Sequence, residues 1–316
     1  MLSGVKRTLC IILLILLTMA LTGCQKTVPQ PRAGDSHSTG YPLTIEDDGG
    51  RSITLEKQPV RIISLAPSHT EILFALGLGD RVVGVTEYCD YPQEARSKPK
   101  IGGFSTPSVE KIIELQPDLV LAGDMHHQVV TTLEAANVKV LVFSPTTMAE
   151  IFAAINQIGK AAGEEQVAQN LLAGLQQRVD AVNAKVEQAQ GAKPRVFYEV
   201  WHEPLTSAAD NTLIGELIRV SGGENIVGPS KDSYPKVSEE IILEKNPDIM
   251  IHSYGHGSNE SLSPEKILKR QGWEHLNFVQ NRRIVGLDAN LINRAGPRIV
   301  DALEAVAQAI HPELFK

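Results

Sequence analysis

The stretch SVEKIIELQPDL, residues 108–119, recurs as SEEIILEKNPDI, residues 238–249, with Ser, Glu, Ile, Glu, Pro and Asp in step. Each copy predicts a short helix that leads into a strand. The serine suits the N-cap, where its oxygen accepts a bond from an orphan backbone N–H, and acidic residues suit the positive end of a helix. Pro-Asp then ends the helix. The runs that follow, 119–121 and 249–251, are apolar without alternation, as in strands of a parallel sheet covered on both faces.

An aromatic residue stands at the same distance before each copy, Phe104 in the first and Tyr234 in the second. Capping, core and stop residues are common to many α/β units, but aromatic residues in register favour duplication of a lobe. Strands and helices alternate in both halves, so we predict an α/β fold of two similar lobes with mostly parallel sheets. The other expected strands are 60–65, 82–85, 138–143, 195–200 and 283–287, with a hairpin at 44–55.

A segment rich in Ala and Gln, 147–190, lies between the two halves and carries apolar residues at helical spacing. We read it as helix, much of it one long segment that joins the lobes. The expected divisions are an N-terminal lobe, a connecting long helix and a C-terminal lobe, at 42–157, 158–192 and 193–316. Within the first lobe, Ser68 and Glu71 have capping-box spacing and predict a helix that ends before Gly77.

The N-terminus predicts export. Residues 1–23 have the order of a signal peptide, with Lys6 and Arg7 before an apolar run. This run is shorter than a transmembrane anchor usually needs. Its last residues, LTGC at 21–24, resemble a bacterial lipobox, which implies cleavage before Cys24 and a lipid on its sulfur. The segment 24–41 is rich in Pro, Gly, Ser and Thr and predicts a flexible tether. We therefore expect an extracytoplasmic protein anchored by lipid to the cell membrane, or a periplasmic one if the organism has an outer membrane.

Composition excludes some function classes. The formal net charge is −7, and without a basic patch we expect no nucleic-acid partner. Once the signal is removed and Cys24 carries its lipid, Cys89 is the remaining thiol, so no intramolecular disulfide is expected. We expect a monomer stabilised by packing.

The chemistry-bearing residues gather at the carboxyl ends of the expected strands, where ligands bind in open α/β sheets. Aromatic residues are only 5% of the chain, yet many of them fall in these loops, as a large flat or apolar ligand requires. The histidines there have the chemistry to ligate a metal, although hydrogen bonding in a polar loop explains each one singly. The candidate ligand-binding residues are Tyr88, Phe104, His126, His127, Trp201, His202, Tyr234 and Tyr254, and His256 lies in the same region.

Several motifs together resemble the substrate-binding proteins of ABC importers whose lobes are joined by one long helix, and most of all the cobalamin-binding members of Btu-type importers. The resemblance covers nearly the whole mature chain. It implies two rigid lobes with the ligand held in the cleft between them, and a permease dimer with its ATPase subunits as the partner. The motifs are IISLAPSHTE (62–71), YCDYP (88–92), PDLV (117–120), SGGENI (221–226), YPKVS (234–238) and GPRI (296–299).

The resemblance also implies residue roles. Tyr88, Phe104 and Tyr234 match aromatic residues that line the cleft of the family, and Trp201-His202 is placed there by position. Gly123 stands where a relative has another aromatic residue, and His126 and His127 are the candidates to fill that space. Glu110 and Glu240, one in each copy of the repeat, match two glutamates that dock onto arginines of the permease. Plain stabilisation of the first helical turn is the alternative for both, and their equivalent places in the repeat favour docking.

Three function classes follow. The first is a corrinoid receptor for import, with cobalamin as the ligand and no resident cofactor. In the second, the same scaffold holds haem or a ferric siderophore, for which Tyr88 or a histidine would bind iron and Arg294 and Arg298 would hold an anionic chelator. The third is a lipid-anchored hydrolase, for which Ser68-His69 is merely adjacent in sequence and no Gly-x-Ser-x-Gly elbow occurs. We therefore assign no catalytic residue and no resident metal site, and we expect no enzyme.

Overall fold

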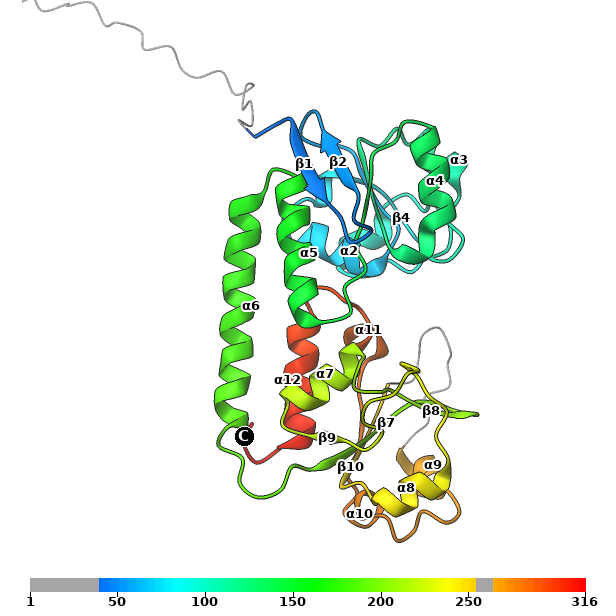
Figure 1. Cartoon of the computed structure of the whole chain (residues 1–316), viewed down its shortest axis with the longest axis vertical. Helices are drawn as coiled ribbons and strands as arrows, with labels where there is room; N and C mark the ends of the chain where they lie inside the picture. The colour runs from blue at the N-terminus through cyan, green and yellow to red at the C-terminus, as the bar shows by residue number, and fades with distance from the viewer. Residues whose placement is uncertain (1–39, 254–263) are drawn as a thin grey trace, which may run out of the picture. The chain divides into compact units, whose positions relative to one another are not determined.

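The repeated stretch forms the same corner in both lobes of the structure, a computed structural model that describes residues 40–253 and 264–316. In the first copy α3 (Val109–Glu114) leads into β5 (Leu119–Ala122), and in the second α8 (Glu239–Lys245) leads into β10 (Ile249–His252). Both strands are fully buried, as the continuous apolar runs predict. The two corners lie in different lobes (Figure 1).

The aspartate of each Pro-Asp pair fastens the corner to the strand beside it. Asp118 accepts bonds from the backbone N–H groups of Val60 and Arg61, each at 3.0 Å, just before β3 (Ile62–Ser64). Asp248 accepts from the N–H of Arg195 at 2.9 Å, at the first residue of β7 (Arg195–His202). The aspartate that ends each helix therefore also fixes, through its hydrogen bonds, the register between adjacent parallel strands.

The N-terminal lobe has a parallel sheet in the order β4-β3-β5-β6 and a separate antiparallel hairpin. Its helices pack on both faces of the sheet, since buried side chains from alternate faces of β3 and β5 fall into two different apolar clusters. The remaining strands are β1 (Leu43–Glu46), β2 (Ser52–Leu55), β4 (Val82–Val85) and β6 (Val140–Val142), and the helices α2 (Pro67–Ala75) and α4 (His127–Ala135), with 3-10 turns at Gly79–Arg81, Gln93–Ser97 and Asp124–His126.

The C-terminal lobe repeats this plan with the order β11-β10-β7-β8, where β8 is antiparallel to β7 and β9 pairs with β7 in parallel. The sheets are thus mostly parallel, as predicted. The remaining strands are β8 (Leu205–Ser207), β9 (Glu224–Asn225) and β11 (Ile284–Gly286), and the helices α7 (Leu213–Val220), α9 (Pro264–Ile267), α10 (Asn277–Gln280), α11 (Ala289–Ile292) and α12 (Ile299–Ile310).

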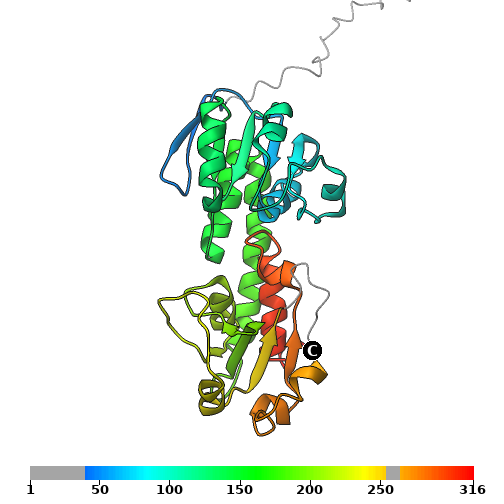
Figure 2. The ribbon, with the colours of Figure 1, turned by 90° about the vertical axis from the view of Figure 1, so that its right-hand side faces the viewer.

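One long helix joins the lobes, as predicted, but its bounds differ from the expected 158–192. The helix α5 (Met148–Ala161) ends in a turn at Gly163, whose φ of +72° favours glycine, and α6 (Glu165–Val186) then runs back along α5 and reaches α12. The observed connecting helix is therefore shorter than predicted, because the first part of the expected segment belongs to α5. Figures 1 and 2 show α6 beside α5 and α12.

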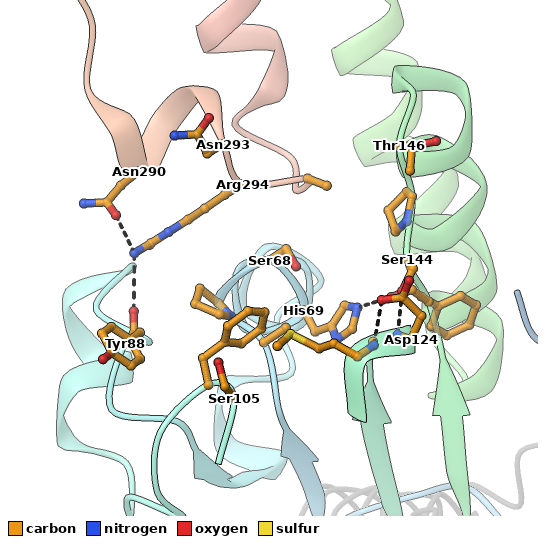
Figure 3. Close-up of a pocket in the computed structure, with 18 of the residues that line it drawn as sticks. Ser68, His69, Tyr88, Ser105, Asp124, Ser144, Thr146, Asn290, Asn293 and Arg294 are labelled. Atoms are coloured by element: carbon orange, nitrogen blue, oxygen red, sulfur yellow. Dashed lines mark hydrogen bonds between the residues drawn. The ribbon is translucent and has the colours of Figure 1, made fainter. Parts of the chain in front are cut away.

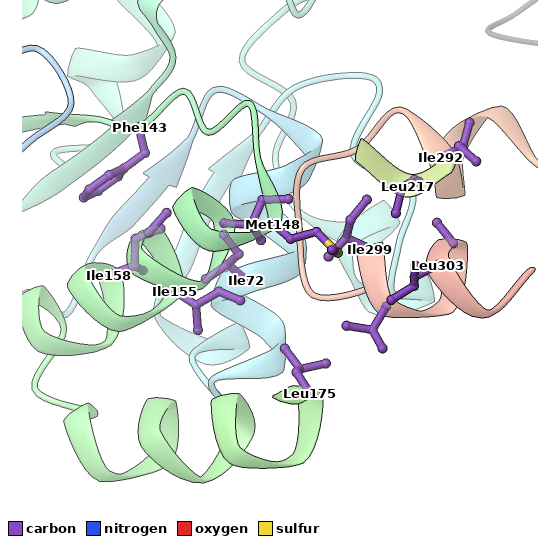
Figure 4. Packing of buried hydrophobic residues seen from close by; sticks show 14 of the residues in the cluster. Ile72, Phe143, Met148, Ile155, Ile158, Leu175, Leu217, Ile292, Ile299 and Leu303 are labelled. Carbon is purple, nitrogen blue, oxygen red and sulfur yellow. The ribbon is translucent and has the colours of Figure 1, made fainter. Parts of the chain in front are cut away.

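One apolar cluster continues from the first lobe into the second. It includes Ile72 of α2, Ile155 of α5 and Leu175 of α6, and it goes on through Leu217 of α7 to Leu303 of α12 (Figure 4). Because protein interiors are close-packed and resist local deformation, this shared core opposes separation of the lobes in the free protein.

Two local predictions are wrong. Ser68 does not cap α2: the N-cap is Ala66, since Pro67 occupies the first helical turn, and Glu71 turns to another partner described below. Ser238 makes no side-chain cap bond, whereas Ser108 accepts from the N–H of Lys111 as predicted.

Candidate ligand-binding cleft

A cavity of about 800 Å³ opens at the carboxyl ends of the N-terminal sheet and is bounded from the C-terminal lobe by α11 and the residues that follow it. Figure 3 shows Asn290 of α11, and Asn293 and Arg294 after it, facing Tyr88 and Ser68 of the first lobe. This is where parallel α/β sheets bind ligands, beyond the ends of their strands.

The lining combines a broad apolar wall with a polar rim. Tyr88 is 58% exposed and Met125 45% exposed, which leaves large apolar surfaces uncovered inside a concave site. Other side chains offer neutral hydrogen-bonding groups. The large apolar and aromatic lining residues are Tyr88, Phe104, Met125 and Phe143, beside the smaller Ala66, Pro67, Pro145 and Ala295, and the neutral polar ones include Ser105, Ser144, Thr146, Asn290 and Asn293.

His126 supports Phe104 from behind and does not face the cavity. Its Nδ1 accepts from the N–H of Gly123 at 3.0 Å, so the proton lies on Nε2, which donates to the carbonyl of Phe104 at 2.8 Å. The imidazole is 2% exposed and meets the Phe104 ring edge-on at 5.4 Å. The prediction that His126 contacts ligand is therefore corrected: both ring nitrogens are committed to main chain. His127 begins α4, is exposed, and is absent from the lining.

His69 forms part of the cavity wall as a neutral imidazole. It lies on α2, is 2% exposed, and its Nε2 donates to the carbonyl of Phe143 at 3.0 Å. Burial lowers the pKa of His69 from 6.5 to about 4, since the charged form would lose its hydration. It therefore brings no positive charge to the cavity at neutral pH.

Four charged side chains join the lobes beside the cavity, and two of them, Asp90 and Arg294, also line it. Glu71 of the first lobe accepts from Arg298 at 2.9 and 2.6 Å and from Arg294 at 3.1 Å. Arg294 also donates to Asp90 at 2.7 Å. Burial alone would raise the pKa of Asp90, but the hydrogen bond and charge of Arg294 lower it below the ordinary value. The bidentate bond to Glu71 raises the pKa of Arg298.

The described predicted site residues of the C-terminal lobe, Trp201, His202 and Tyr234, lie outside the lining of this cavity. Trp201, at the end of β7, is 42% exposed and its Nε1–H donates to the carbonyl of Glu203 at 2.8 Å. His202 follows it, and Tyr234 is 48% exposed, with its pKa raised by burial. Tyr254 and His256 lie outside the described residues.

A second charged group lies at the ends of the C-terminal strands. Glu199 on β7 is fully buried and accepts both terminal nitrogens of Arg270, whose guanidinium lies 4.6 Å from the centre of the Trp273 ring. Burial raises the pKa of Glu199, and Arg270 opposes that shift. Because each charge is neutralised by the other, this pair resembles a structural ion pair.

The two glutamates of the repeat are exposed at equivalent helix starts. Bonds from its own backbone N–H and from Ser108 lower the pKa of Glu110, and the Ser238 hydroxyl and its own backbone lower that of Glu240. Both are therefore ionised at neutral pH. One turn further, each helix exposes an apolar side chain to the same degree, 42% for Ile113 and 44% for Leu243. Each lobe thus presents an exposed carboxylate in the first turn of this helix and an uncovered apolar side chain one turn further along it.

The described residues contain neither a metal-binding cluster nor a membrane-spanning helix. Residues 40–253 and 264–316 contain no cluster of three His, Cys, Asp or Glu side chains suited to a metal ion. Within the same ranges, no helix is long and apolar enough to cross a membrane. Cys24 and the predicted signal peptide lie outside them.

Comparison with known proteins identifies the family. A family model described as periplasmic binding protein matches residues 62–291, most of the chain. The chain belongs to the periplasmic binding protein family. Members of this family bind solutes and are not enzymes.

This periplasmic binding protein is similar both to a relative of unassigned ligand and to relatives that bind different ligands. A Bacillus subtilis relative, named an uncharacterized ABC transporter substrate-binding lipoprotein, is 31% identical over 311 residues, 96% of each chain. The vitamin B12-binding protein BtuF of Vibrio cholerae is 30% identical with a TM-score of 0.68, over 82% of this chain and 98% of that one. The haem-binding protein BhuT, solved with two haems, is 25% identical with a TM-score of 0.73, over 80% and 98%.

The cleft residues that the sequence did not single out follow directly after predicted strands. Ser144 and Thr146 come after β6, and Asp124 and Met125 after β5. The rule that ligands lie beyond strand ends could have found them. Asn290 and Asn293 had no such signal, since they reach the cavity through the short helix α11 of the other lobe.

Proposed function

We propose that this protein captures cobalamin or a related corrinoid outside the cytoplasm and delivers it to the permease of an ABC importer. The observation that carries the proposal is the charge of the cleft. Arg294 is the one Arg or Lys among the described lining residues, and it is already paired with Glu71 and Asp90. The lining also carries Glu87, Asp90 and Asp124. A site of this kind suits a ligand with a flat apolar ring and neutral amide side chains, as a corrinoid has.

The alternative is haem or a ferric siderophore. The haem-binding relative supports it, and the exposed phenol of Tyr88 has the chemistry to bind ferric iron. Haem carries carboxylates, however, and a trihydroxamate or catecholate complex is anionic. Such ligands need cationic donors that are free to pair with them. Arg294 and Arg298 were the candidates, and both are bound to Glu71.

The test is a parallel titration of residues 40–316, which form one compact unit. Cyanocobalamin, cobinamide and haemin are the probes, and tryptophan fluorescence and the visible spectrum of the ligand are the readouts. We expect one corrinoid bound per protein, with haemin weaker by at least about tenfold, the scale of a single unpaired charged contact. Tight binding of haemin, with no detectable binding of either corrinoid, would instead assign the protein to haem or iron uptake.

The variant pair Tyr88→Phe and Tyr88→Ala separates the two ligand classes. The phenylalanine keeps the ring and removes the phenol, so corrinoid affinity should survive it and fall only in the alanine variant. If Tyr88 ligates iron, the phenylalanine variant should lose haemin binding together with its characteristic absorption band.

Docking and anchoring complete the proposal. Glu110 and Glu240, each beside an exposed apolar side chain, would present matched surfaces to a permease dimer with two-fold symmetry, which pairs them with arginines. Cys24 would carry the lipid that holds the protein at the membrane. Labelled palmitate should enter the wild-type protein in bacterial cells and be absent from Cys24→Ser. Retention of label in that variant would refute the lipid assignment.

A further inference from the structure

Arg294 reaches from one lobe to the ligand-contacting loop of the other. It follows α11 in the C-terminal lobe and is 9% exposed. One terminal nitrogen, Nη1, donates to Glu71 at 3.1 Å and to Asp90 at 2.7 Å, while Nη2 donates to the backbone carbonyl of Tyr88 at 3.3 Å and to Asn290 at 2.9 Å. Figure 3 shows the guanidinium between Asn290 and Tyr88.

The contacts of Arg294 fall on both sides of the residue that anchors the loop within its own lobe. Cys89 is 1% exposed, and its sulfur lies 3.1 Å from the Thr70 hydroxyl and 3.2 Å from the Thr86 hydroxyl. Tyr88 and Asp90, its neighbours, are held from across the cleft. Other bonds within the first lobe hold the loop as well, among them those from Arg96 Nε to the carbonyl of Asp90 at 3.1 Å and from Lys100 Nζ to the carbonyl of Cys89 at 3.3 Å. The loop therefore has supports that stay with the first lobe, and it has the bonds from Arg294 to Tyr88 and Asp90, which are lost if the lobes separate.

We propose that Arg294 is a positioning residue that fixes the Tyr88 loop in its ligand-binding conformation only while the two lobes are together. Spreading of the lobes by the permease then withdraws Arg294, loosens segment 87–91 and takes the Tyr88 ring away from the ligand. Lobe separation and ligand release become one event. The release step rests on the proposed corrinoid-binding function, whereas the ordering of the loop by Arg294 does not.

The ion pairs of Glu71 allow this role to be tested without unpairing a buried carboxylate. Arg298 makes two bonds to Glu71 on its own, so Arg294→Gln leaves that carboxylate neutralised. Asp90→Asn is a milder second variant, because it weakens the bond to Arg294 and leaves every bond to Glu71 in place. Arg178→Gln is the matched control: it removes an arginine paired with Asp301 and Glu304 between α6 and α12, away from the cleft.

The first measurement is amide hydrogen exchange of residues 40–316 without ligand. We expect exchange in peptides that cover 86–92 to be faster by about tenfold in Arg294→Gln, the scale of one charge-assisted hydrogen bond, and faster to a smaller degree in Asp90→Asn. Exchange in β5 and β10 should stay as in the wild type. Arg178→Gln should leave 86–92 unchanged. Equal exchange of 86–92 in wild type and Arg294→Gln would overturn the inference.

The second measurement is cyanocobalamin affinity, combined with Tyr88→Ala. Arg294→Gln should weaken binding by about tenfold in the wild-type background and have no further effect once the Tyr88 ring is gone. Additive losses would refute a role through Tyr88. If the wild type binds neither corrinoid nor haemin, the proposed function fails, and the exchange experiment alone decides whether Arg294 orders the loop.

Discussion

The buried imidazole of His69 makes the stability of the protein depend on pH in a window that the structure defines. In the unfolded chain this histidine takes up a proton below its ordinary pKa of 6.5, whereas in the folded protein burial lowers the pKa to about 4. A depressed folded pKa gives stability that is fully present above pH 6.5 and is lost as the pH falls towards 4. The loss amounts to roughly 3 kcal/mol, from 1.36 kcal/mol for each pH unit of the shift.

The perturbation that isolates this effect is His69→Gln. The glutamine amide can still donate to the carbonyl of Phe143, as the imidazole Nε2 does, but it does not titrate. Urea unfolding of residues 40–316, followed by circular dichroism between pH 7 and pH 4, gives the free energy of unfolding of both proteins. Carboxylates and His252, whose pKa is also lowered to about 4, titrate in both proteins and cancel in the difference.

The expected result is a difference between wild type and variant that changes by roughly 3 kcal/mol between pH 6.5 and pH 4 and is constant above pH 7. The wild type should lose stability relative to the variant on acidification. Parallel pH profiles for the two proteins would show that His69 is protonated in the folded state as readily as in the unfolded chain. The buried, neutral assignment would then be wrong.

Three other outcomes follow from contacts described above. The double variant Glu110→Ala with Glu240→Ala should abolish uptake in cells while ligand affinity in calorimetry stays unchanged, and unimpaired uptake would remove both residues from docking. Tyr88→Ala should weaken ligand binding by about 1–3 kcal/mol in isothermal titration, the loss of one aromatic contact, and an unchanged affinity would take Tyr88 out of the site. Asp118→Ala should lower the free energy of unfolding by about 2 kcal/mol in urea, because two backbone N–H groups lose a charged acceptor, and an unchanged midpoint would contradict this role of Asp118.

The main features of the fold could be read from the sequence because the decisive signals are local. The apolar runs of β5 and β10 have no alternation, and the two copies of the repeat carry the same stop. What Asp118 does beyond ending a helix could not be read, because its acceptor role needs the neighbouring strand that only the fold supplies. The turn at Gly163 was missed for a related reason: helical spacing continues on both sides of it.

The site was predicted in part. Tyr88 and Phe104 line the cavity as expected. The role of His126 could not be predicted, because the sequence does not show whether a loop histidine is free to contact ligand or is hydrogen-bonded to the main chain at both ring nitrogens, as His126 is. Glu71 shows a second kind of error. Its spacing from Ser68 fits a capping box, yet its partners are two arginines more than two hundred residues away in the chain.

The two lobes share an apolar core, although the repeat suggests that one lobe arose by duplication of the other. The corner α3–β5 has a counterpart in α8–β10. The apolar cluster that includes α2, α5, α6 and α12, however, is continuous from one half of the chain to the other. A polypeptide cut in the turn at Gly163 would give two fragments that each leave an apolar face in water, a cost that favours aggregation over solubility. Produced together, the fragments should find each other and rebuild the cluster. The two halves repeat a pattern, but they fold as one molecule.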